Sequence, residues 1–284
     1  MKRWNPEPPV PLDGTTPADA GAALAAWFAT PVGRYLLDWE QARFDEAVVD
    51  WFGFNALQMG LPELDALRTN RMPHRWLSVP EVLPAGMSMA RSALVSDAAA
   101  LPFPEKSLDL VALPHTLELS ADPHAVLREV ERVLVPEGRV VICGLNPISW
   151  WGLRQYRAHA LARVGLGHTR MARLFLPEAG EFIGSQRLRD WLQLLDLEVT
   201  VCRYGCYRPP VQGEKWLHRW RWMDRMGPRS WPFLGAVYFM VAVKRVKGMH
   251  LLGPAWKPRR SVAAPVTVLQ RPSLRQPPHM ESPR

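Results

Sequence analysis

Apolar residues recur at helical spacing in three segments of the chain. In residues 34–52 the apolar positions include Tyr35, Leu36, Trp39, Ala42, Val48, Val49 and Phe52. Charged residues lie between them, and this periodicity is typical of an amphipathic helix with one buried face. Glu40 belongs to the polar positions of this pattern, and Gly53 is the predicted stop signal. Residues 123–134 and 185–195 show the same spacing, with Asp122 as the N-cap of the first.

Short apolar runs alternate with these segments and predict strands. The runs cover residues 56–60, 76–79, 93–96, 108–113, 139–144, 199–204 and 236–244. Alternation of strands and helices predicts an α/β fold, with a central sheet covered by helices on both faces. The helix over residues 34–52 precedes the first strand and is an N-terminal helical addition to that sheet.

The two ends of the chain lack a core-forming pattern. Residues 1–20 are rich in proline and small residues, and residues 246–284 carry seven prolines and seven basic residues. Both segments are predicted to be disordered, which leaves residues 21–245 as the folded domain. No stretch approaches 18 consecutive apolar residues, and the proline-rich start is unlike a signal peptide, so no transmembrane helix or leader is predicted.

Charge is distributed unevenly along the chain. The formal net charge is +8, yet residues 1–150 hold 19 acidic against 12 basic side chains, a net of −7. Residues 151–229 have a net charge of +7 and the tail has +6. A uniformly basic protein favours nucleic acid as a partner, and the acidic first half weakens that interpretation. Three cysteines cannot form a disulfide framework, which favours a reducing, cytoplasmic location.

The segment from Ser96 to Gly144 is the most informative part of the sequence. In order it contains Asp97-Ala98, Leu101-Pro102-Phe103, Ser107-Leu108-Asp109, His115 to Leu119, Arg132-Val133-Leu134 and Pro136-Glu137-Gly138. This run resembles the second half of class I S-adenosylmethionine-dependent methyltransferases, specifically the type 11 methyltransferase domain. Residues 30–40, 56–62, 70–76 and 144–154 extend the resemblance to a bacterial subgroup of these proteins. The resemblance implies a Rossmann-like sheet of about seven mostly parallel strands, with the last strand antiparallel.

The resemblance also implies S-adenosylmethionine as cofactor and assigns residues to its site. The ligand lies at the carboxyl ends of the parallel strands. Asp97 occupies the position that accepts a hydrogen bond from the adenine amino group, beside Ala98. The alternative is that Asp97 only stabilises a turn, a common role of Asp in loops. Pro114 and His115 follow the fourth strand, at the methyl end of the cofactor. His115 could act as a general base, line the site as a polar wall or stabilise a turn.

The sequence departs from the family pattern after the first strand. Gly60 is kept, but Gln58 stands at the position of an acid, and Pro62 and Leu64 replace glycines that let the backbone approach the cofactor. Glu81 is the nearest candidate for the acid that binds the ribose. We expect residues 53–150, which contain all of these positions, to form the cofactor half of the domain.

Residues 151–235 form the expected acceptor or lid half. There Trp216, Trp220 and Trp222 interleave with Lys215, Arg219, Arg221 and Arg225. The i,i+4 spacing of Trp216 and Trp220 favours a packing helix or lid, while binding of nucleic acid or of an anionic membrane surface is the alternative. Cys202 and Cys206 have the wrong spacing for a zinc site, so no metal is predicted.

Three hypotheses about function follow. The first is methyl transfer from S-adenosylmethionine to an unidentified acceptor, a small molecule, with no side chain singled out as catalytic. The second is a methyltransferase-like module that binds or regulates without catalysis, which the altered glycine loop motivates. The third is a nucleic-acid-associated protein that uses the basic tail and the tryptophan segment.

Overall fold

The computed structural model describes residues 17–80, 92–163, 175–176, 182–211 and 213–245. The helices are α1 (Pro17–Phe28), α2 (Pro31–Val48), α3 (Thr116–Leu119), α4 (Pro123–Val133), α5 (Trp150–Arg163), α6 (Ser185–Leu194), α7 (Glu214–Arg219), α8 (Met223–Ser230) and the 3-10 helix η2 (Pro232–Leu234). The strands are β1 (Asn55–Met59), β2 (His74–Val79), β3 (Ser92–Val95), β4 (Leu108–Pro114), β5 (Leu134–Leu145), β6 (Leu197–Gly205) and β7 (Val237–Lys244).

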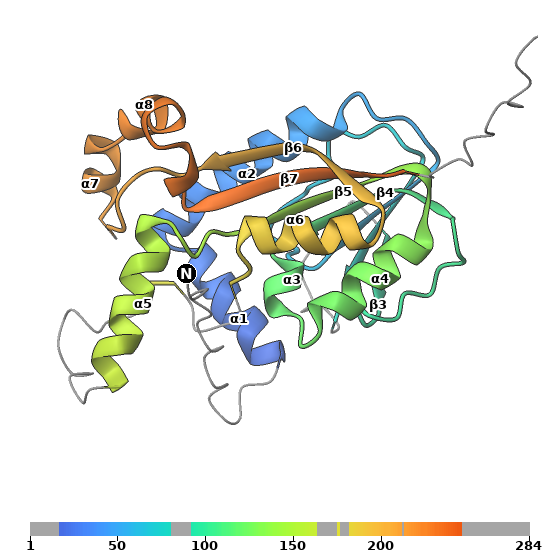
Figure 1. Ribbon diagram of the computed structural model, residues 1–284, viewed down its shortest axis with the longest axis horizontal. Helices are drawn as coiled ribbons and strands as arrows, with labels where there is room; N and C mark the ends of the chain where they lie inside the picture. The colour runs from blue at the N-terminus through green and yellow to red at the C-terminus, as the bar shows by residue number, and fades with distance from the viewer. Residues whose placement is uncertain (1–16, 81–91, 164–174, 177–181, 212, 246–284) are drawn as a thin grey trace, which may run out of the picture. The chain divides into compact units, whose positions relative to one another are not determined.

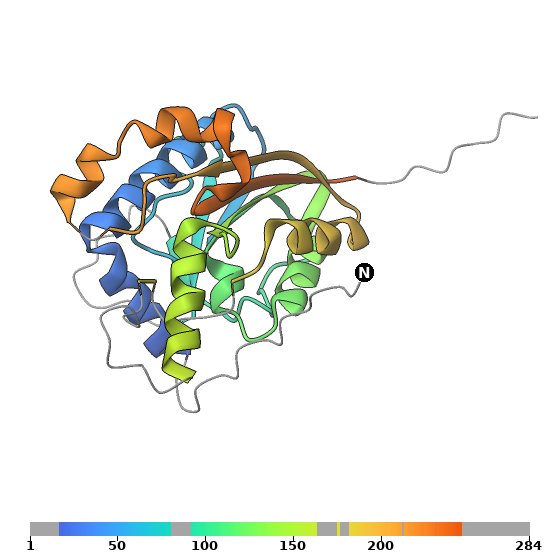
Figure 2. The same ribbon diagram turned by 60° about the vertical axis from the view of Figure 1, so that its left-hand side comes forward.

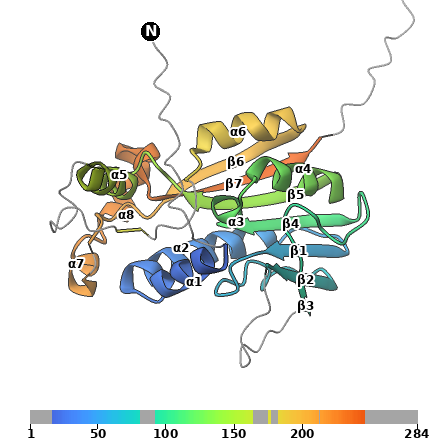
Figure 3. The ribbon, with the colours of Figure 1, turned by 90° about the horizontal axis from the view of Figure 1, so that it is seen from below.

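The strands of the described segments form one seven-stranded sheet in the order β3-β2-β1-β4-β5-β7-β6, which Figure 3 shows from below. β1 to β5 run parallel to one another, whereas β7 runs antiparallel to both β5 and β6. This arrangement confirms the predicted α/β fold with an antiparallel last strand. All seven predicted strands are present, with ends shifted by a few residues.

Two hydrophobic clusters cover the two faces of the sheet, since successive side chains of a strand point to opposite faces. On one face Val130 of α4 and Leu188 of α6 pack against strand residues such as Val111. On the other face Leu36 and Phe44 of α2 belong to a cluster with Leu110 of β4 and Val141 of β5, whose side chains point to that face. Helices therefore cover the sheet from both sides (Figure 1).

Local signals explain where the main helices begin. The Thr30 side chain caps α2 by accepting a hydrogen bond from the Gly33 N–H, and Asp122 caps α4 in the same way at Ala125. Each cap is followed by a proline at the start of the helix, which suits the first turn because proline needs no donor there. The Asp122 prediction is confirmed, and α2 begins three residues earlier than predicted.

Two sequence predictions are wrong in the described residues. Residues 17–20 belong to helix α1 and not to a disordered arm. The helix over residues 34–52 ends at Val48, so Gly53 is not its stop. Gly53 instead allows the Asp109 side chain to lie close to the backbone, since a Cβ at residue 53 would lie 2.5 Å from Cγ of Asp109. The Asp109 carboxylate accepts hydrogen bonds from the N–H groups of Phe54 and Asn55. Helix α1 packs beside α5, through Trp27 and Trp151, at one end of the sheet (Figure 2).

The connection from β1 to β2 contains no helix. Residues 60–73 form turns, although parallel neighbours are usually joined by a helical crossover. The apolar side chains of this crossover are buried under α2; they are Leu61, Leu64, Ala66, Leu67 and Met72. Within the described segments, no helix has the length and apolar character needed to cross a membrane.

Candidate functional site

The carboxyl ends of four neighbouring parallel strands bring the predicted site residues to one edge of the sheet. The order β3-β2-β1-β4 places Asp97 at one end of this edge and His115 at the other. Gly60 and Pro114 end adjacent strands, and a Cβ built on Gly60 would lie 4.0 Å from the Pro114 carbonyl oxygen. Adjacent strands lie about 4.8 Å apart, so Asp97 and His115 are separated by three strand spacings, about 14 Å.

Gly60 adopts the backbone conformation for which glycine is suited. Its φ is +68°, and the nearest atom to a Cβ would be Oγ1 of Thr116 at 3.4 Å. The Thr116 hydroxyl donates to the Met59 carbonyl oxygen at 2.6 Å, which joins the end of β1 to the start of α3. The structure thus places Gly60 at a tight turn next to the end of β4.

Asp97 is exposed and lies in a turn after β3. Its Oδ1 accepts a hydrogen bond from the Ala99 N–H at 2.9 Å, so the turn-stabilising role predicted as an alternative is present. A carboxylate has about four acceptor sites, and this bond occupies one of them. The geometry is therefore compatible with both roles of Asp97. Ala98 beside it is half-buried.

Gln58 organises the crossover after β1 from inside. The side chain is completely buried; its Nε2 donates to the carbonyl oxygens of Leu61 and Leu64, and its Oε1 accepts from the Ala66 N–H. An amide side chain can donate and accept at once, whereas a carboxylate cannot donate. Gln at the position of the family's acid therefore serves the crossover backbone, a role that the sequence did not indicate.

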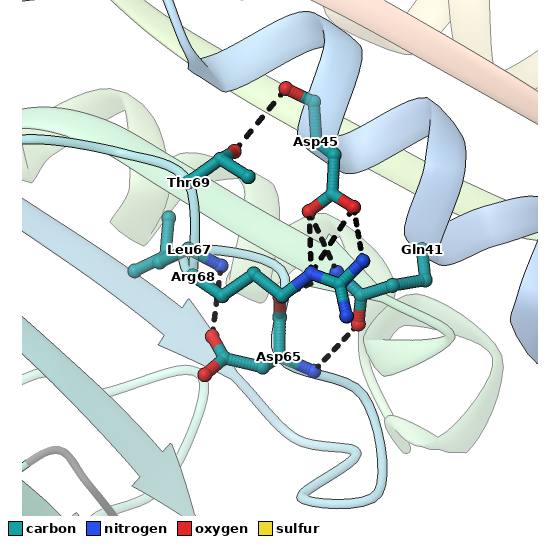
Figure 4. A network of polar contacts seen from close by, with 6 residues as sticks. All are labelled: Gln41, Asp45, Asp65, Leu67, Arg68 and Thr69. Atoms are coloured by element: carbon teal, nitrogen blue, oxygen red, sulfur yellow. Dashed lines mark hydrogen bonds and ion pairs between the residues drawn. The ribbon is translucent and has the colours of Figure 1, made fainter.

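Polar contacts also attach the crossover to α2 (Figure 4). Gln41 exchanges two hydrogen bonds with the backbone of Asp65, and Arg68 forms a bidentate ion pair with Asp45. Thr69 donates its hydroxyl to the Asp45 carbonyl oxygen. Together with the buried leucines, these contacts fix the segment in which the family has a glycine-rich cofactor loop.

His115 is buried between two carboxylates. Its φ is +52°, an unusual value for a residue other than glycine. Nε2 lies 2.8 Å from Oε1 of Glu40 on α2, and Nδ1 lies 2.7 Å from Oε2 of Glu118 on α3. The thiol of Cys143 also donates to Oε1 of Glu40. All four side chains are buried, so this cluster joins α2, α3, β4 and β5.

The charge of the His115 cluster follows from its geometry. Burial lowers the pKa of His115 because it disfavours the charged form, but the nearby charges of Glu40 and Glu118 and the hydrogen bonds to them outweigh burial and raise the pKa to about 10. The imidazole is then protonated at neutral pH and donates from both nitrogens. An imidazolium bonded on both sides offers no lone pair to a substrate, which disfavours the general-base role. Glu40 was assigned to the polar face of its helix by the sequence pattern, and that assignment is wrong.

The predicted acceptor half shows both buried and exposed aromatic residues. Trp151, Trp27 and Phe175 form edge-to-face contacts, and the Trp27 indole donates to the Phe175 carbonyl oxygen. Arg154 donates to the Pro210 carbonyl oxygen. By contrast, Trp216 and Trp222 are 55% and 43% exposed, so they do not pack in the core. Glu81, residues 1–16 and the tail 246–284 lie outside the described residues.

A family model described as a methyltransferase domain matches residues 80–142. The uncharacterized protein YafS of Escherichia coli is 42% identical over 99 residues, which are 35% of this chain and 36% of that protein. Demethylmenaquinone methyltransferase of Mycobacterium tuberculosis is 29% identical over 128 residues, 44% of this chain and 52% of the enzyme. The chain thus matches only about a third to a half of the length of these curated relatives.

Two solved structures share the fold. The methyltransferase in complex with the Haloferax volcanii Trm112 methyltransferase activator has a TM-score of 0.54 at 17% identity and covers 81% of this chain and 100% of its own. A SAM-dependent methyltransferase from Thermotoga maritima has a TM-score of 0.50 at 15% identity, and the match covers 78% of this chain and 94% of that structure's chain. Residues 80–142 thus match a methyltransferase domain, and the described fold is one that solved methyltransferases share, in agreement with the resemblance of residues 96–144.

Proposed function

We propose that this chain transfers a methyl group from S-adenosylmethionine to a small-molecule acceptor. The observation that carries the proposal is that the methyltransferase match, residues 80–142, coincides with the segment that ends β3 and β4 at the candidate site. That segment supplies Asp97 and Ala98 at one end of the edge and Pro114 and His115 at the other. Methyl transfer is also the activity in the name of the mycobacterial relatives, demethylmenaquinone methyltransferase.

The residues present fit a nucleoside-containing ligand at two places. Asp97 offers an exposed carboxylate with acceptor capacity left after its bond to Ala99. Gly60 leaves open the space that a side chain would fill in front of the end of β4. We assign Asp97 and Ala98 to the adenine end of the cofactor, and Gly60 and Pro114 to the end that carries the methyl group. His115 contributes here by fixing the backbone after β4 through its two carboxylate partners.

When bound, S-adenosylmethionine supplies an activated methyl group for displacement by the acceptor atom. The chain's task is to hold the acceptor in line with this group, and positioning of this kind can account for several kcal/mol of barrier reduction. No described side chain needs to act as a base in this scheme.

The substitution Asp97→Asn tests the adenine assignment. Asn keeps the oxygen that accepts from the Ala99 N–H, so the turn is retained, but it replaces the remaining carboxylate oxygen by an amide that cannot accept a bond from an amino group. S-adenosylmethionine at about 100 times its dissociation constant should stabilise the unmodified chain by roughly 2.7 kcal/mol, a rise in Tm of about 5–10 °C. We expect Asp97→Asn to reduce the affinity, measured by calorimetry, by at least tenfold.

Asp38→Asn provides the matched control, because Asp38 is an exposed carboxylate on α2 and not on a strand end. It should leave the affinity unchanged. If Asp97→Asn also binds normally, Asp97 only stabilises its turn and the adenine assignment is wrong. If the unmodified chain shows neither a Tm shift nor heat with S-adenosylmethionine or its demethylated product at millimolar concentration, the enzyme proposal is wrong as well.

A second function is favoured by one observation, the crossover after β1. Gln58 and the buried leucines use this segment for the core, where the family places glycines that approach the cofactor. A chain with this loop could bind a ligand at the strand ends without catalysing methyl transfer. Tight binding of the demethylated cofactor, together with no turnover of any methyl acceptor, would support this binding module.

A further inference from the structure

Helices α7 and α8 carry apolar and basic side chains together on the outside of the molecule. Trp216, Trp222 and Met226 are 55%, 43% and 50% exposed. Arg219, Arg221 and Arg225 are exposed between them, and the Arg219 guanidinium lies 5.9 Å from the centre of the Trp216 ring. We call these six residues the Trp–Arg surface. Trp216 lies in α7 and Trp222 is the N-cap residue of α8, and exposed rings of this size mark a candidate interaction surface because their burial is strongly favourable.

The inner side of the same two helices is fixed to the fold. Leu217 of α7 is buried, and Gly227 of α8 is buried against the ring of Tyr207. Asp224 accepts hydrogen bonds from the Tyr35 hydroxyl and from the Tyr207 N–H, and it pairs with Arg208 at 2.8 Å. The helices therefore present the Trp–Arg surface in a defined orientation, and its exposure does not result from a loosely attached segment.

Charge on this segment is one-sided. Residues 213–230 contain Lys215, Arg219, Arg221, Arg225 and Arg229 against only two acidic residues, Glu214 and Asp224. Asp224 faces inward and is already paired, so five basic side chains against the exposed Glu214 leave the outward charge positive. A partner with complementary charge is anionic, and the apolar rings require that it also accept indole and thioether groups.

We propose that the Trp–Arg surface binds the interface of an anionic lipid membrane. Indole rings favour the boundary between headgroups and acyl chains, and each arginine near an anionic bilayer adds attraction of about fivefold in affinity. A long nucleic acid fits less well, because the first 150 residues have a net charge of −7 and would repel it along its length. The proposal does not depend on whether the chain transfers methyl groups.

Hydrogen bonds and an ion pair connect this surface to α5, the helix that follows β5. Residues 206–211, which lead into α7, accept hydrogen bonds from α5: the Trp151 indole donates to the Arg208 carbonyl oxygen at 2.7 Å. Arg208 in turn holds Asp224 of α8. Figure 3 shows α5, α7 and α8 at the same end of the described fold. Membrane binding would therefore hold α5 on the side of the fold that faces the lipid.

Sedimentation with vesicles tests the proposal on the full chain. Vesicles of phosphatidylcholine with 30% phosphatidylserine should bind the protein, whereas pure phosphatidylcholine should bind it at least tenfold more weakly. The triple variant Arg219→Gln, Arg221→Gln, Arg225→Gln should lose about 100-fold in affinity for the anionic vesicles. Trp216→Ala with Trp222→Ala should also weaken binding, and that loss should persist in high salt.

Matched control variants carry the same kinds of substitution at exposed positions outside the Trp–Arg surface. Arg71→Gln, Lys106→Gln and Arg128→Gln together remove three exposed charges from the first half of the chain and should leave vesicle binding unchanged. Phe52→Ala removes a ring that is 81% exposed and should also have no effect. Circular dichroism of every variant establishes that it is folded.

Three results would overturn the proposal. Vesicle binding that the triple variant retains would assign membrane attachment to another part of the chain. Tight binding of a 30-nucleotide RNA at 150 mM salt, without vesicle binding, would assign the surface to nucleic acid. A dimer in sedimentation velocity that Trp216→Ala with Trp222→Ala dissociates, without vesicle binding, would assign it to a second copy of the chain.

Discussion

The candidate site follows the carboxyl ends of four parallel strands, and the polar side chains at the two ends of this edge of the sheet differ in burial. At β1 and β4 the polar side chains are buried and bonded: Gln58 holds the crossover backbone, and His115 lies between Glu40 and Glu118. At β3 the polar side chain is Asp97, which is exposed and has a single neighbouring backbone partner among the described contacts. Both ends follow parallel strands of one sheet, so topology alone does not explain the difference.

The difference identifies which residues can still meet a ligand. A buried group with partners on every side is costly to disturb, since an unsatisfied buried polar atom costs about 1–3 kcal/mol. An exposed carboxylate can exchange water for a ligand at little cost. Substitutions of the buried side chains Gln58 and His115 should therefore affect stability, while substitution of the exposed Asp97 should affect binding.

Removal of the Gln58 side chain should have the largest effect. Gln58→Ala leaves the Leu61 and Leu64 carbonyl groups and the Ala66 N–H without their partner, and it opens a cavity under α2. We expect the free energy of unfolding, measured in urea, to fall by about 3–5 kcal/mol. Gln58→Met keeps the volume but not the bonds and should lose nearly as much. Gln193→Ala, on an exposed position of α6, should change it by less than about 0.5 kcal/mol.

The His115 cluster should make stability depend on pH. The folded pKa of about 10 lies above the unfolded value near 6.5, so the stabilisation is complete below pH 6.5 and is lost as the pH rises toward 10. The unfolding free energy should fall by about 2 kcal/mol between pH 6.5 and 8.5. His115→Gln should flatten this profile, whereas His218→Gln, on the exposed side of α7, should preserve it. A flat profile in the unmodified protein would mean that His115 is neutral.

Asp97→Ala should affect stability less than either change above. It removes one exposed side-chain bond to the Ala99 N–H, worth about 0.5–1 kcal/mol in the unfolding free energy. The same variant should bind S-adenosylmethionine much more weakly. A stability loss as large as that of Gln58→Ala would show that the two ends of the edge do not differ as we infer.

The Arg68–Asp45 ion pair of Figure 4 should contribute least. The Arg68 side chain is 53% exposed, and pairs of this kind contribute about 0.2–1 kcal/mol. Arg68→Ala should lower the unfolding free energy by no more than this, and 0.5 M NaCl should reduce the difference further. A larger loss would mean that the crossover depends on its surface contacts to α2 and not mainly on its buried leucines.

The sequence by itself determined the fold. The alternation of strands and helices, the cap at Asp122 and the motif over residues 96–144 depend on local periodicity and on fixed spacing, both of which can be read without coordinates. The same motif located Asp97 and His115 at the strand ends. The sequence also showed that Pro62 and Leu64 replace glycines, but not what the changed crossover does.

Only the tertiary structure decided the environment of each side chain. Glu40 occupies a polar position of a helical pattern, yet it is buried because a partner 75 residues away, His115, reaches the same space. Gln58 is bound by its own crossover, and Trp216 and Trp222 are exposed although apolar residues usually pack inward. Burial and partnership depend on contacts between distant segments, and a periodicity confined to one segment contains no information about them.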